Sequence, residues 1–206
     1  MTPIPFSTYD MSEADAQNQF EIYTALKTNY DTEIDSDFSI NIRDFSIFNA
    51  NELNSHGATF RITNNSRPFY LEFIEILYRT GGQRYSSGIY VEYQTWGTIN
   101  LKNSFGHIII KPETFLDKIH DLINPVDMDF EDDKEFSNKF LVVTNDKLKA
   151  QMQITKNFRN CIMQIQLKEF IIEIVDNKLI VGDRKIVSLE SALEFAKYLN
   201  KLAGAF

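Results

Sequence analysis

Residues 69–79 read FYLEFIEILYR, and this stretch indicates what kind of fold the chain adopts. It is rich in β-branched and aromatic residues, which favour strands, and SGIYVEYQTWGTINL (87–101) and GHIIIKP (106–112) have the same character. Short segments with Gly, Asn and Ser separate these runs and are typical of turns. Together with ATFRIT (58–63) upstream, they predict an antiparallel meander at the centre of the chain.

Upstream of this meander, EIDSDFSINIRD (33–44) has two interpretations. Its oxygen-bearing side chains are spaced almost as in a calcium-binding EF-hand loop. That loop needs Gly at its sixth position and Glu at its twelfth, where this chain has Phe38 and Asp44. Apolar and polar residues alternate from Glu33 to Arg43, so we predict a half-buried strand and no bound calcium.

The remaining elements are predicted from periodicity and capping residues. Helices are expected from Ser12 to about Thr28, over ETFLDKIHDLI (113–123), from Thr155, and from about Ser188, where Ser191 and Glu194 have capping-box spacing. Hairpins are expected for KFLVVTN (139–145) with LKAQMQI (148–154), and for EFIIEIV (169–175) with KLIVGD (178–183).

These elements predict an α+β fold, with a mainly antiparallel sheet of meander and hairpins and three to four packed helices. The 206 residues are enough for one globular unit with a real core. An acidic connection at residues 125–136 is the best internal boundary. The sequence is therefore compatible with a single undivided unit and with one unit built from two lobes, 1–124 and 137–206.

Composition limits the classes of function. The net charge of −8 disfavours general binding to nucleic acid. A lone cysteine excludes an internal disulfide framework, and the N-terminus does not read as a signal peptide. No apolar run reaches the length of a membrane span. We expect a cytoplasmic protein.

Three segments carry a resemblance to a known family: TWGTINLKNSFGHIIIKPE (95–113), FSNKFLVVTNDKLKAQMQITKNF (136–158) and FIIEIVDNKLIV (170–181). In their order of strands, turns and helices they resemble an uncharacterised bacterial family known only as a domain of unknown function. The resemblance covers about residues 19–181. It implies a β-rich domain with packed helices and brings no catalytic residues. Several members carry membrane-spanning helices that this chain lacks.

Residues with reactive chemistry are few and scattered. His56, His107 and His120 fall in different segments without metal-ligand spacing. Cys161 is placed at helical spacing with Phe158 and Ile162, which predicts a buried position in the core. We therefore predict no catalytic residue, no metal and no cofactor.

Two classes of function remain open. The first is a non-catalytic domain that binds a protein or peptide, or associates with itself. The second is a small-molecule-binding or enzymatic domain whose pocket is built from distant residues. The candidate interaction patch is Arg84, Tyr85, Tyr90 and Trp96, because Tyr, Trp and Arg anchor many interfaces. The hypothesis is that at least part of this aromatic set is exposed, and the alternative is that Tyr90 and Trp96 pack beneath a helix.

Overall fold

The structure is a computed structural model that describes residues 4–8, 11–38, 40–48, 53–63, 67–82, 85–114 and 126–204. At residues 53–56, 79–82, 85–87 and 89 only the backbone is described. The strands are β1 (Asp31–Ile34), β2 (Leu53–Thr63), β3 (Phe69–Gly82), β4 (Tyr85–Asn100), β5 (His107–Pro112), β6 (Val126–Asp127), β7 (Phe140–Thr144), β8 (Ile171–Val175) and β9 (Lys178–Ile186). The helices are α1 (Glu13–Asn29), α2 (Lys134–Lys139), α3 (Lys147–Gln153), α4 (Lys156–Met163), α5 (Leu189–Ala203) and the short 3-10 helix η1 (Ile42–Asp44).

The strands of the described residues form one sheet in the order β1-β2-β3-β4-β9-β8-β5-β7-β6, and all neighbours are antiparallel. The α+β class with a mainly antiparallel sheet is therefore confirmed. The sheet is continuous across the two lobes considered above, because β4 pairs with β9.

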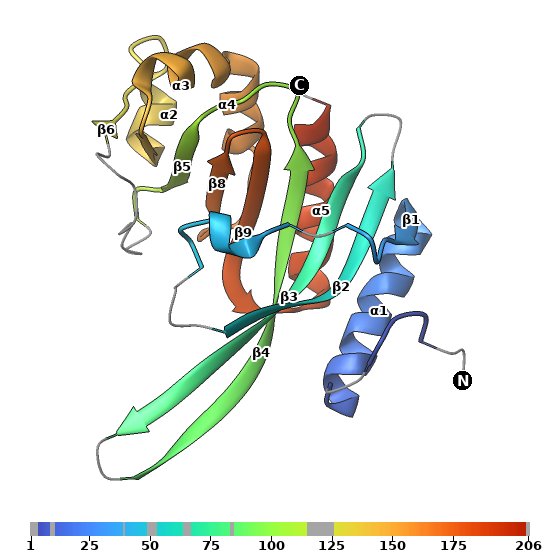
Figure 1. Ribbon diagram of the computed structural model, residues 1–206. Helices are drawn as coiled ribbons and strands as arrows, with labels where there is room; N and C mark the ends of the chain where they lie inside the picture. Colours follow the sequence, from blue (N-terminus) through green and yellow to red (C-terminus); the bar gives the residue numbers. More distant parts are fainter. Residues whose placement is uncertain are drawn as a thin grey trace.

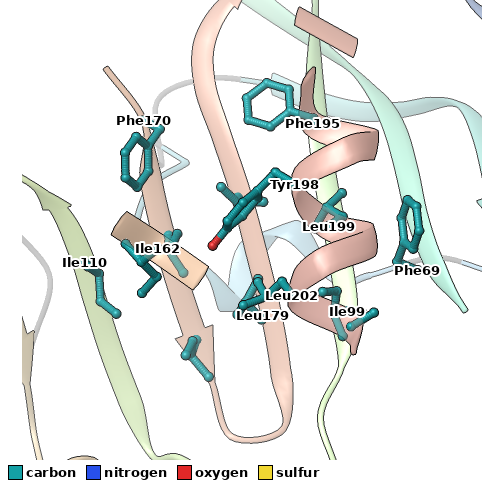
Figure 2. Close-up of a cluster of buried hydrophobic side chains, with 14 of the residues drawn as sticks. Phe69, Ile99, Ile110, Ile162, Phe170, Leu179, Phe195, Tyr198, Leu199 and Leu202 are labelled. Carbon is teal, nitrogen blue, oxygen red and sulfur yellow. The ribbon is translucent and has the colours of Figure 1, made fainter. Parts of the chain in front are cut away.

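The main core lies between the sheet and the helices. Phe69, Leu71 and Phe73 alternate along β3 and face the helices, as period-two spacing requires. Figure 2 shows Tyr198, Leu199 and Leu202 of α5 next to sheet residues such as Leu179 and Ile99, with Ile162 of α4 on the same side of the sheet. All of these side chains are buried.

The opposite face of the sheet is covered by residues 40–48, which we call the strap (Figure 1). The strap contributes a second core of its own. Its buried members are Ile40, Ile42, Phe45, Ile47 and Phe48, packed on Ile74, Ile76, Trp96, Ile109, Val143, Ile171 and Ile180 of the sheet. Both faces of the central strands are therefore buried, which explains their nearly continuous apolar composition.

Two predicted strands are corrected by the structure. Of the described residues within 33–44, only Glu33 and Ile34 are in a strand, because β1 ends at Ile34. The Asp35 carboxylate then accepts bonds from the backbone N–H groups of Asp37 and Phe38. Such a side-chain turn redirects the chain into the strap. The apolar positions Ile40 and Ile42 are buried, but in the strap rather than in a strand.

The second correction concerns residues 148–154, which belong to helix α3 and its C-cap Ile154 and not to the second strand of a hairpin. Asp146 caps this helix, since its carboxylate accepts a bond from the backbone N–H of Lys149 at 3.0 Å. The alternation that suggested a strand is misleading, because Leu148 and Met152 are exposed and only Ala150 between them is buried.

Other predicted elements are present. Helix α1 follows its predicted N-cap Ser12, α4 follows Thr155, and β8 and β9 form a hairpin across Asp176 and Asn177. Helix α5 begins after Ser188 as expected, but its capping box is made by Ser188 and Ser191 rather than by Ser191 and Glu194. The helix predicted over 113–123 falls almost entirely outside the described residues.

Candidate interaction surface on the β3–β4 ribbon

Strands β3 and β4 continue beyond the end of β9 as a ribbon, residues 75–82 and 85–93 (Figure 1). Beyond Leu77, where β2 ends its pairing with β3, the ribbon has two strands. Its register continues that of the sheet as far as Thr80 opposite Gly88, with Tyr78 opposite Tyr90, and then shifts before Gly82 opposite Tyr85. On its other side β4 pairs with β9, and this pairing ends at Gln94, which lies opposite Ile186. In the part of the chain that the structure describes, no strand lies beside the outer edge of β4 before that pair.

Exposed apolar side chains lie along this edge. The side chain of Tyr90 is 50% exposed and that of Val91 is 47% exposed, on opposite faces of β4. Tyr90 stacks on Tyr78 with ring centroids 4.9 Å apart. Ile186, at the end of β9, is also exposed. The ribbon thus presents apolar groups on both faces next to an edge that can accept another strand.

A chain of polar contacts connects the ribbon to the core. The Gln94 amide donates to Glu92 Oε1 at 2.7 Å and to the Tyr78 hydroxyl at 3.1 Å. Its Oε1 accepts the indole N–H of Trp96 at 3.2 Å. These contacts hold the base of the ribbon in a fixed relation to the sheet.

The structure separates the residues of the predicted patch. Tyr90 is exposed, so the expectation that part of the set is accessible holds, whereas Trp96 is 0% exposed and belongs to the core. Trp96 lies under the strap, with its ring 4.9 Å from that of Phe48, and not beneath a helix as the alternative supposed. Arg84 and the side chain of Tyr85 lie outside the described residues, and a role for this patch in binding stays a prediction.

Sequence reasoning missed Val91 and Ile186 as parts of this surface. Their exposure depends on where β9 ends and where the strap crosses the sheet, which local patterns do not contain. The one available signal was the length of the alternating run around Tyr90, because this run is longer than the predicted strands that could pair beside it.

Of the three histidines, His107 lies beside a buried glutamate, Glu173, that bonds to the strap. The Glu173 carboxylate of β8 is fully buried and accepts bonds from the Ser46 N–H at 2.8 Å, the Ser46 hydroxyl at 2.9 Å and the Ile47 N–H at 2.9 Å. His107 Nε2 also contacts this carboxylate. The Glu173 carboxylate therefore fixes the strap to the sheet, and His107 of β5 contacts this same carboxylate.

His120 and the side chain of His56 fall outside the described residues, and within these we find no group of three or more His, Cys, Asp or Glu side chains arranged to hold a metal. Cys161 is partly buried and packs against the main core, so it is less enclosed than predicted. Burial raises the pKa of its thiol, which lowers the fraction of reactive thiolate.

Among the helices that the structure describes, none has both the length and the apolar character needed to cross a membrane.

Comparisons with known proteins show a likeness in fold. No family model matches the chain, and no curated protein matches it. It is similar to the crystal structure of the mycobacterial trehalose monomycolate transport factor A, TtfA, with a TM-score of 0.54 and 8% sequence identity, over 94% of this chain and 95% of that one. At this identity the likeness shows a shared fold, and the resemblance to an uncharacterised bacterial family stays a prediction.

Proposed function

We propose that this chain is a non-catalytic protein-binding domain that associates through the outer edge of β4 in the ribbon. The observation that carries the proposal is the open edge from Tyr85 to Glu92 with the exposed side chains of Tyr90 and Val91 beside it. An added strand would pair with β4 on the same side as β9, beyond the point where β9 ends. It would make main-chain hydrogen bonds together with apolar contacts. A neighbour of the same fold that is described as a transport factor is consistent with a role other than catalysis.

The sequence of this edge suits a second copy of the same chain. Residues 85–92 read YSSGIYVE and contain no Lys, Arg or Pro, the residues that natural proteins use to protect edges. Their single charge, Glu92, is already engaged by Gln94. In an antiparallel two-fold pair, the two Glu92 side chains face each other only if the axis passes through that residue, so most registers avoid like-charge contact.

Introducing a lysine on the edge is expected to prevent this association. Val91→Lys and Tyr90→Lys should each weaken dimer formation at least tenfold, about 1.4 kcal/mol, because each replaces an exposed apolar side chain beside the edge with a charge that opposes the addition of another strand. Sedimentation equilibrium between about 1 and about 200 µM protein resolves an interaction of this strength.

The matched control is Leu148→Lys on α3, a surface residue 76% exposed and remote in sequence from the ribbon. It makes the same kind of change and should leave the monomer–dimer equilibrium unaltered. A wild-type protein that stays monomeric over the whole concentration range would contradict self-pairing, as would a dimer that all three variants affect equally.

A further inference from the structure

A pocket of about 560 Å³ lies near the edge of the sheet that β1 forms. It is enclosed by the N-terminal segment, the end of β1 and strand β2. This volume is in the range of sites that bind small molecules. The lining residues are Pro5, Phe6, Ser7, Met11, Ile34, Asp35, Ser36, Phe38, Gly57, Ala58, Thr59, Glu75 and Tyr93.

Local packing sets the shape of this pocket before any ligand arrives. The register of β2 shifts between His56 and Thr59. A Cβ at Gly57, within that shift, would lie 2.6 Å from the carbonyl oxygen of Phe73, so no larger residue fits there without movement. On the other side, Phe6 is held by edge contacts with Phe60 and Tyr23. Phe38 stacks on Tyr70. The aromatic walls are therefore preformed.

Among the described residues that line the pocket, the charged groups are both carboxylates, Asp35 and Glu75, and none is Lys, Arg or His. Each carboxylate is oriented by a donor of the protein itself. Asp35 Oδ1 accepts the backbone N–H groups of Asp37 and Phe38, and Glu75 Oε2 accepts the hydroxyl of Tyr93 at 3.0 Å. Within the described residues neither forms an ion pair, and the second oxygen of each has no described hydrogen-bond donor.

We infer that this pocket binds a small organic amine, with its ammonium group at Asp35 and Glu75 and its apolar body against Phe6 and Phe38. Two partly enclosed carboxylates without a cation favour a positive ligand, and the aromatic faces attract both ammonium groups and apolar groups. The net charge of −8 supports the same sign of ligand. The pocket shares Glu75 and Tyr93 with the ribbon, but its described lining does not include residues 85–92 of the proposed edge, and the inference does not depend on the function proposed for that edge.

Titration calorimetry with 2-phenylethylamine, which is cationic at neutral pH, tests this inference. Saturable binding of one amine per chain is expected, and the neutral isostere 2-phenylethanol should bind at least about tenfold more weakly because it lacks the charge. In a parallel NMR titration, the backbone amides of Thr59 and Glu75 should show the largest shifts.

Charge-removing variants locate the site. Asp35→Asn and Glu75→Gln keep an oxygen that can accept the bonds described above, and each should weaken the amine about fivefold or more. Asp37→Asn is the matched control, because Asp37 is exposed, lies two residues from Asp35 and is not among the lining residues. It should leave the affinity unchanged.

The inference is overturned if the amine does not saturate the protein, if 2-phenylethanol binds as well as the amine, or if the shifts gather away from β2 and β3. The comparison between the two ligands uses the wild-type protein, so it decides the question even where a variant is poorly folded.

Discussion

Replacing Trp96 by alanine is expected to lower the free energy of unfolding by about 3–5 kcal/mol, the range for removing a fully buried large aromatic side chain. The ring is 0% exposed and packs between Phe48 of the strap and the backbone at Gly182. A Cβ at Gly182 would lie 2.4 Å from the Trp96 ring, so the two residues fit closely and the cavity left by alanine has little room to close.

In a chain of this length such a loss lowers the midpoint of thermal unfolding by about 10 °C, which circular dichroism measures directly. Tyr90→Ala, on the same face of the same strand, is the control. Tyr90 is half exposed and loses mainly its stacking on Tyr78, a contribution of about 1 kcal/mol. Equal losses for the two variants would contradict the assignment of one ring to the core and the other to the surface.

The second large effect is expected at Glu173. In Glu173→Ala the backbone N–H groups of Ser46 and Ile47 lose their acceptor, although the strap still packs them against the sheet. Unsatisfied buried donors are costly, and we expect a loss of about 3 kcal/mol or more in the free energy of unfolding, measured by urea denaturation. The strap should also open locally, so that the amides of Ser46 and Ile47 exchange with solvent much faster than in the wild-type protein.

Two variants separate the anchoring role from the loss of a carboxylate in general. Glu173→Gln keeps an acceptor oxygen in a side chain of the same size, and it should lose less stability than Glu173→Ala. Glu169→Ala removes an exposed glutamate that forms an ion pair with Lys185, and it should change stability by less than about 1 kcal/mol. Unchanged protection of the strap amides in Glu173→Ala would show that Glu173 does not hold the strap.

Much of the fold was predictable because several segments have strong local signals. The alternating runs at 69–79 and 87–101 become β3 and β4, and the hairpin over 169–183 becomes β8 and β9. In that hairpin the turn residue Asp176 adopts a positive φ of 53°, a conformation that Asp tolerates better than most residues. Local preference and tertiary packing agree in these segments.

The two mispredicted strands have a common physical cause. An alternating pattern reports which side chains are buried, and a strap laid across a sheet buries Ile40 and Ile42 as a strand would. At α3 the pattern was coincidental, and the decisive feature was the single cap at Asp146. A single capping residue before a helix of only 7 residues is a weaker sequence signal than an alternation of apolar and polar residues along the whole segment.

The interaction surface was only partly predictable for a related reason. Period two places Tyr90 and Trp96 on the same face of β4, and nothing in that period says where the sheet ends. The strap and β9 cover β4 at Trp96 and leave Tyr90 exposed. These covering segments come from positions far away in the sequence.

Hydrogen exchange along β4 tests the central claim, that the outer edge of β4 in the ribbon is the binding surface. The exchange of residues 85–93 is measured by mass spectrometry at about 2 µM and about 200 µM protein, two concentrations that bracket a weak self-association. We predict that exchange in this segment slows at the higher concentration in the wild-type protein and stays fast in Val91→Lys, while the strand amides of β8 are equally protected at both. Association that leaves the exchange of residues 85–93 unchanged, and slows exchange elsewhere on the surface, would contradict the claim.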